Sequence, residues 1–212
     1  GGAANLLTGS TMAPSESCDI VAFGDSFTDD GVGRGDLHGF KKYSNGPVWP
    51  TYLAKSLGCQ PDDVRNFAYG GATSGMGNLV YKSWSGLLWQ VDQYTTYYRN
   101  SKSSNTVAAF LPCGDNDFYT FGQKHGEVYK DIDPKIIAEF EDTIIENNMN
   151  AVNKLVDAGV KQIIFTDMIL GLSSNSPDQR SPENAVNREM KGQLVERMNK
   201  KLTEKVLKYK VA

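Results

Sequence analysis

Three short stretches of this sequence contain residue types that can attack an ester and stabilise the charge that develops. The first, "FGDSFTDDG", places Ser26 directly after an apolar run that ends at a glycine. The second, "YGGATSG", contains Gly71, and the third, "CGDND", contains Asn116. A hydroxyl is a nucleophile, whereas backbone amides and asparagine side chains can donate hydrogen bonds to an oxyanion. Together the stretches indicate ester hydrolysis through a tetrahedral intermediate.

Each stretch taken alone has a simpler explanation. Serine, aspartate, asparagine and glycine are common in turns, where they cap the segment that follows. The chemical interpretation therefore depends on whether the fold brings Ser26, Gly71 and Asn116 to one place.

Strand-like and helix-like segments alternate along the chain. Apolar runs predict strands at 19–24, 64–71, 106–114 and 161–168. Amphipathic spacing predicts helices at 47–58, 86–100, 134–159 and 181–210. This alternation is typical of an α/β domain with a parallel sheet and helices on both faces. Ligands bind such folds beyond the carboxyl ends of the strands, so the three stretches should meet at that rim.

Composition limits the classes of function. The 212 residues fit a single domain, which we place at 18–212, and residues 1–17 have the composition of a flexible N-terminal segment or an expression scar. A net charge of −3 gives no electrostatic signature of nucleic-acid binding, and no apolar run reaches the roughly 18 residues of a membrane span. Cys18, Cys59 and Cys113 have no zinc-site spacing, and they allow either one disulfide with a free thiol or three free thiols.

The three stretches, in this order, resemble the motif blocks of the GDSL lipases and esterases, also called SGNH hydrolases. Two intervening segments, "YSNGPVWPTYLAKSLG" and "LVDAGVKQIIFTDMI", resemble the plant and fungal branch of that family. The similarity covers nearly the whole chain from Asp19 onward. It implies a flavodoxin-like three-layer α/β/α sandwich with a mainly parallel sheet. The implied activity is that of a serine esterase or lipase that uses no cofactor and no metal.

The resemblance also implies a role for each matched residue. Ser26 would be the nucleophile, and Ser26, Gly71 and Asn116 would supply the N–H groups of the oxyanion hole. Asp25 and Asp117 would order the loops without taking part in the chemistry. The implied substrate is a small ester, an acetylated carbohydrate or a lipid, and the implied location is secreted or extracellular, although the chain contains no Asn-x-Ser/Thr sequon.

One part of the family pattern has no counterpart here. The base in that family is a histidine in a C-terminal Asp-x-x-His block after the fourth strand, whereas His38 and His125 lie outside any such block. The catalytic histidine is therefore unassigned, and we expect the chain to lack the family's last strand. From this we expect weak or no activity of the chain alone. We also expect a second copy or a partner chain to cover the exposed sheet edge.

Two other classes of function compete with the enzyme. The first is a non-catalytic acyl- or carbohydrate-binding protein of the same fold. The second is a metal-dependent phosphoryl-transfer enzyme, in which acidic residues of the first stretch would hold Mg²⁺: Asp25, Asp29, Asp30 and Asp36. The second alternative gives the glycine and asparagine stretches no role. Several aromatic residues could stack on a sugar or line an acyl pocket, but packing the core explains them as well: Trp49, Trp84, Trp89, Tyr94, Tyr97 and Tyr98.

Overall fold

The computed structural model describes residues 18–31, 43–98, 106–126, 128–169 and 182–211, and every structural statement below concerns these residues. The N-terminal segment 1–17, His38 and Asp36 lie outside the described residues.

Four parallel strands form the sheet, and their order is β2-β1-β3-β4. The strands are β1 (Ile20–Phe23), β2 (Val64–Asn66), β3 (Val107–Phe110) and β4 (Gln162–Phe165). Each strand lies inside the range predicted from its apolar run but is shorter than that range, and β2 covers only the first three residues of the predicted 64–71. Every residue of the two central strands is buried, because helices cover both of their faces. The predicted α/β class is confirmed.

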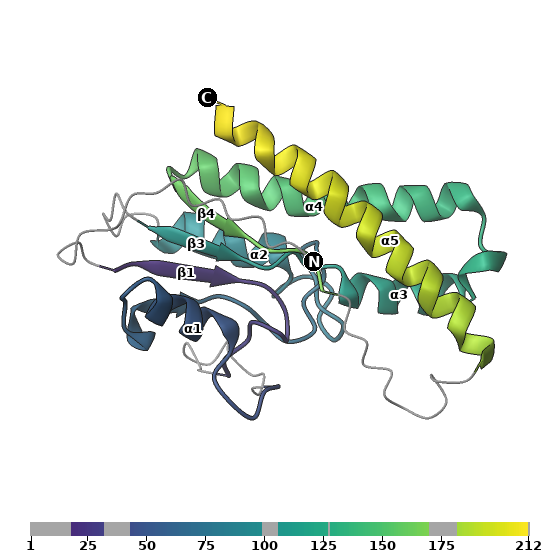
Figure 1. Ribbon diagram of the computed structural model, residues 1–212, viewed down its shortest axis with the longest axis horizontal. Coiled ribbons are helices and arrows are strands. Elements are labelled where there is room, and N and C mark those ends of the chain that lie inside the picture. Colours follow the sequence, from purple (N-terminus) through teal and green to yellow (C-terminus); the bar gives the residue numbers. More distant parts are fainter. Residues whose placement is uncertain (1–17, 32–42, 99–105, 127, 170–181, 212) are drawn as a thin grey trace.

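Helices pack on both faces of this sheet (Figure 1). They are α1 (Trp49–Ser56), α2 (Leu87–Gln93), α3 (Asp115–His125), α4 (Pro134–Asp157) and α5 (Pro182–Leu207). Short helical turns lie at Pro61–Asp63, Tyr94–Tyr98, Tyr129–Asp131 and Lys208–Val211. Successive strand residues point to opposite faces, so Val21 and Phe23 pack with α2 and α4, whereas Ile20 and Ala22 pack with α1. The result is the expected three-layer sandwich.

A second apolar cluster lies beyond the carboxyl ends of the strands and joins α3, α4 and α5. The arrowheads in Figure 1 point toward α3, and α5 lies across α4. Phe118 and Phe121 of α3 contribute to this cluster together with Met198 and Leu202 of α5. Glu141 of α4 is buried beside it and pairs with Arg197 of α5 at 2.5 Å. Among the described helices, none combines the length and apolar character needed to cross a bilayer.

The helix α3 was not predicted from the sequence, which indicated a loop at "CGDNDFY". The polar run Asp115, Asn116 and Asp117 is typical of a turn, but here it forms the first turn of a helix. Two acidic residues at this position interact favourably with the helix dipole. The difference matters, because it puts Asn116 on a regular element.

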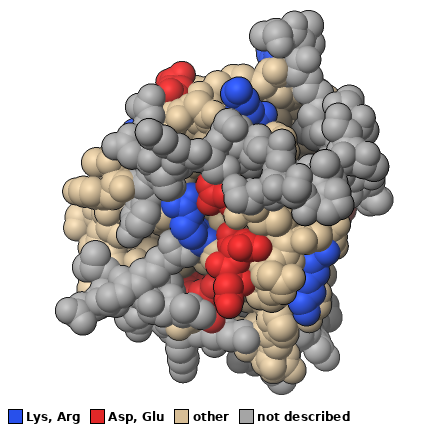
Figure 2. All heavy atoms as spheres, turned by 90° about the vertical axis from the view of Figure 1, so that its left-hand side faces the viewer, with Lys and Arg blue, Asp and Glu red and all other residues tan. Residues whose placement is uncertain are grey.

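The strand β4 forms one edge of the sheet, since among the described residues it pairs only with β3. The expected copy or partner chain at this edge stays a prediction. Figure 2 shows the face at the left of Figure 1, where acidic and basic side chains lie beside one another. The described part of that face therefore carries both signs of charge.

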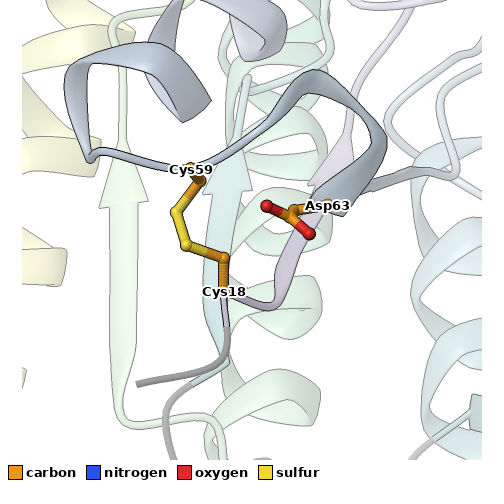
Figure 3. A group of neighbouring side chains, drawn as sticks. All are labelled: Cys18, Cys59 and Asp63. Carbon is orange, nitrogen blue, oxygen red and sulfur yellow. A yellow bond between two sulfur atoms is a disulfide. The ribbon is translucent and has the colours of Figure 1, made fainter. Parts of the chain in front are cut away.

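A disulfide joins Cys18, just before β1, to Cys59, just after α1 (Figure 3). It settles the question that the sequence left open, because Cys113 is free and buried. Asp63 lies near the two sulfurs, within 4.8 Å. This group is not a metal site, because metal binding needs thiolates and these sulfurs are bonded to each other.

We predict that reduction of this disulfide destabilises the protein. The bridge closes a loop of 41 residues, and a loop of that size corresponds to about 4 kcal/mol of chain entropy in the unfolded state. Thermal melting with and without dithiothreitol measures the effect. The double variant Cys18→Ser/Cys59→Ser is the control: its melting temperature should already be lowered and should not respond to dithiothreitol. Equal melting of the parent under both conditions would contradict the prediction.

Candidate active site

The loop after β1 forms a tight turn around Asp25. The N–H groups of Thr28 and Asp29 both donate to the Asp25 carbonyl at 2.9 Å, and the Phe27 N–H donates to Asp25 Oδ1 at 3.0 Å. Ser26 is the half-buried second residue of this turn. Its own N–H has no acceptor among the described residues.

A buried glutamine that the sequence analysis missed fixes the start of this loop. Gln90 of α2 accepts the N–H of Gly24 at 3.0 Å and donates to the carbonyl of Gly24 at 2.8 Å. Its amide also donates to the carbonyl of Ser85 at 3.0 Å. The Gly24 N–H has no backbone acceptor among the described residues, and the Gly24 carbonyl otherwise accepts only a long bond from the Tyr69 N–H at 3.4 Å, so this side chain supplies the missing partners.

The loop after β2 is tied directly to the first loop. Asp29 Oδ2 accepts the N–H of Gly70 at 2.7 Å, and the N–H of Ala72 donates to the carbonyl of Tyr69 at 3.1 Å. Gly71 lies between them with φ +81°, a conformation that glycine adopts without strain. Among the described residues, the Gly71 N–H has no acceptor, although both of its neighbours do.

The third candidate, Asn116, reaches the second loop from the first turn of α3. Its Nδ2 donates to the carbonyl of Ala72 at 2.8 Å. A carboxamide carries two N–H donors, so one remains for another acceptor. The structure thus links the loops that carry Ser26, Gly71 and Asn116 through hydrogen bonds at one edge of the sheet.

Asp117 also connects α3 to the second loop. Its two carboxylate oxygens accept the N–H of Ser74 at 2.8 Å and the Ser74 hydroxyl at 2.7 Å. Asn147 of α4 donates to the same hydroxyl at 3.0 Å. Local sequence patterns do not identify Ser74 or Asn147, because their contacts join segments 43 and 73 residues apart.

Burial governs the charge of the two aspartates that flank the site. It raises the pKa of Asp25 from 3.8 to about 7, and the negative charge of Asp115 acts in the same direction, against the hydrogen bond from Phe27. Burial likewise raises the pKa of Asp117 to about 6, against the two hydrogen bonds from Ser74. Between pH 6 and 7 each group is therefore partly protonated and partly ionised.

His125, the histidine that lies within the described residues, packs at the end of α3 that is remote from Asn116. His125 is the last residue of α3, nine residues after Asn116, which corresponds to about 13 Å along the helix axis. Its ring lies 4.7 Å from the ring of Phe121. The structure gives this histidine a packing contact and brings it to none of the three loops.

Asp29, one of the acidic residues that could hold Mg²⁺, instead binds backbone groups. Asp29 is fully buried, and its two oxygens accept the backbone N–H groups of Gly31 and Gly70 at 2.9 and 2.7 Å. Because both carboxylate oxygens of Asp29 already accept backbone N–H groups, they are poorly placed to bind Mg²⁺. This weighs against the phosphoryl-transfer alternative.

The aromatic residues divide between packing and exposure. Trp49 donates from Nε1 to Thr28 Oγ1 at 2.9 Å, so it supports the first loop. Trp84 and Trp89 pack edge-on with Tyr69, next to the second loop. Tyr94 packs on Phe23 in the core, whereas Tyr97 is exposed, and the side chain of Tyr98 lies outside the described part of the chain.

The raised pKa of Asp25 predicts how stability depends on pH. A carboxyl group whose pKa is higher in the folded state stabilises the fold below its unfolded pKa of 3.8, and this stabilisation is lost as the pH rises toward about 7. Asp25→Asn keeps an acceptor for the Phe27 N–H but cannot ionise. We therefore expect the free energy of unfolding to fall less steeply between pH 4 and 7 in this variant, by up to about 1.4 kcal/mol per pH unit.

Urea unfolding at several pH values measures this slope. Asp62→Asn removes an exposed carboxylate and is the matched control. If Asp25→Asn and the control have the same slope, the interpretation of Asp25 is wrong.

Comparisons with known proteins identify the family of this chain. Residues 20–212 match the family model described as GDSL-like Lipase/Acylhydrolase. A comparison with curated proteins found no match. The family match covers nearly all of the chain and all three loops, and membership of this family implies an ester hydrolase. The chain belongs to the GDSL-like lipase/acylhydrolase family.

Proposed function

We propose that this protein is a serine ester hydrolase in which Ser26 is the nucleophile. The N–H groups of Ser26, Gly71 and Asn116 form the oxyanion hole. One observation carries the proposal: each residue has an N–H without an acceptor among the described residues, although the groups around it are bonded. Such donors are available for a charge that exists only during the reaction. Membership of an acylhydrolase family supports the same conclusion.

The reaction follows from this arrangement. Ser26 Oγ attacks the ester carbonyl carbon, and the electron pair of the C=O bond moves to its oxygen. The three N–H donors stabilise this oxyanion, and the alcohol then leaves when the tetrahedral intermediate collapses to an acyl-enzyme. Water attacks the acyl-enzyme and releases the acid. Donors held in place before the reaction cost no reorganisation, and each is worth roughly 3–4 kcal/mol.

A general base must take the proton from Ser26 Oγ and pass it to the oxygen of the leaving alcohol. In the second step it takes a proton from the attacking water and returns it to Ser26 Oγ. The family resemblance assigns this role to a histidine. His125 packs on Phe121 at the far end of α3 and has no part in the proposal. His38 lies outside the described residues, so its variant belongs in the same set of measurements.

We predict that Ser26→Ala abolishes ester hydrolysis. The measurement is turnover of p-nitrophenyl acetate and butyrate by the purified protein. We expect kcat/KM to fall by roughly 10³-fold or more, because the substitution removes the nucleophile. Ser56→Ala changes an exposed helical serine and should leave turnover intact. His125→Asn should also leave it intact, and His38→Ala shows whether that residue is the base.

The non-catalytic alternative makes the opposite prediction. An acyl- or carbohydrate-binding protein would bind esters without turnover, and Ser26→Ala would leave that binding unchanged. Turnover that survives Ser26→Ala would also refute the proposal, because it would place the reaction elsewhere.

We further predict that Asn116→Ala lowers kcat by about 10²- to 10³-fold, with a smaller change in KM, as expected for loss of an oxyanion donor. The substitution also removes the bond to the Ala72 carbonyl, so thermal melting must accompany the kinetics. The matched control is Asn150→Ala at an exposed position of α4. A rise in KM at constant kcat would instead make Asn116 a substrate-binding residue.

The finer aspects of the function are proposals of the same kind. The substrate is a small ester, either an acetylated carbohydrate or a lipid. Steady-state rates measured with an acetylated sugar and with a lipid ester distinguish these two classes. We place the protein in a secreted or extracellular setting, because disulfides such as Cys18–Cys59 persist in oxidising compartments.

A further inference from the structure

A buried asparagine outside the three loop motifs, Asn78, donates a hydrogen bond to the loop that carries Gly71. We infer that Asn78 is a positioning residue that aims the N–H of Gly71 into the site. The inference rests on the proposed function and adds a residue to it.

Every backbone carbonyl of residues 70–72 accepts a hydrogen bond. Asn78 Nδ2 donates to the carbonyl of Gly70 at 2.7 Å, and the N–H of Leu79 donates to the carbonyl of Gly71 at 3.0 Å. The carbonyl of Ala72 accepts Asn116 Nδ2 at 2.8 Å. Since the N–H groups of Gly70 and Ala72 also have acceptors, the Gly71 N–H is the one backbone polar group of this tripeptide left without a partner among the described residues.

The geometry of the peptide group connects Asn78 to that N–H. The carbonyl of Gly70 and the N–H of Gly71 belong to one planar trans unit and point in opposite directions. The bond from Asn78 to this carbonyl therefore fixes the direction of the N–H. Because Leu79 holds the next carbonyl, the peptide planes on both sides of the Gly71 α-carbon are fixed at φ +81°.

The site requires a carboxamide in this position. Asn78 is 4% exposed, and its Oδ1 accepts the N–H of Val80 at 2.8 Å while its Nδ2 donates to Gly70. Its own N–H donates to the carbonyl of Tyr81 at 2.6 Å, which closes a turn. A carboxylate would offer two acceptors and no donor, so the Gly70 carbonyl would face a negative charge.

The test is Asn78→Asp in the purified protein, assayed with p-nitrophenyl acetate. We expect kcat to fall about 10- to 100-fold, less than for removal of a whole donor, with KM within about threefold of the parent. Phenylboronic acid, which forms a tetrahedral adduct on a serine hydroxyl, provides a second readout. Its inhibition constant should rise by the same factor as kcat falls, a change that a purely structural role would not produce.

Two further variants control the experiment. Asn78→Ser removes the carboxamide without adding a charge, which covers the case in which Asn78→Asp does not fold. Asn150→Asp makes the same chemical change at an exposed position of α4 and should leave kcat unchanged. Thermal melting reports the folding of each variant.

The outcomes separate this inference from the proposed function. Turnover that depends on Ser26 but is unchanged in a folded Asn78→Ser variant would overturn the role of Asn78 alone. A higher KM at constant kcat, or loss of folding in both Asn78 variants, would also overturn it. A parent protein without Ser26-dependent turnover would overturn the proposed function and this inference together.

Discussion

The hydrogen bond from the Gly70 N–H to the carboxylate of Asp29 joins the first two loops of the site. Both loops leave parallel strands at the point where sheet pairing stops, so their backbone groups lose their regular partners while they remain buried. An unpaired buried peptide group costs free energy comparable to a lost hydrogen bond. Asp29, which is fully buried, provides that partner and is in turn held by the turn that Asp25 begins.

The same constraint explains the unusual set of buried polar side chains around the site. Gln90 and Asn78 are almost fully buried, and each gives its carboxamide to backbone groups of a loop. Asn66 does the same: it donates to the carbonyl of Thr28 and accepts the N–H of Ala68. A carboxamide suits this task because it donates and accepts at once. Among the described residues of these loops, the three that the motifs single out each keep an N–H donor without an acceptor.

Local patterns were enough to predict the fold and the candidate residues, but not the contacts that organise them. The four strands and most of the helices follow from apolar runs and helical spacing, and the meeting of the loops follows from parallel topology. The first turn of α3 was missed because Asp115, Asn116 and Asp117 favour a turn by composition. Gln90, Asn78 and Ser74 were missed because their importance lies in a partner distant in sequence or in a single peptide group, for which periodicity contains no signal.

The electrostatics of the site contain an apparent conflict, because an oxyanion would form near acidic side chains. Asp25 and Asp117 are flanked by Asp115, and three full charges there would oppose the developing negative charge of the intermediate. Burial lessens the conflict, since it disfavours the ionised forms of Asp25 and Asp117 and raises their pKa values to about 7 and about 6. In its protonated form each carboxyl can still accept the N–H group that it holds, from Phe27 at Asp25 and from Ser74 at Asp117. The site can thus use aspartates for loop structure at reduced electrostatic cost to the proposed reaction.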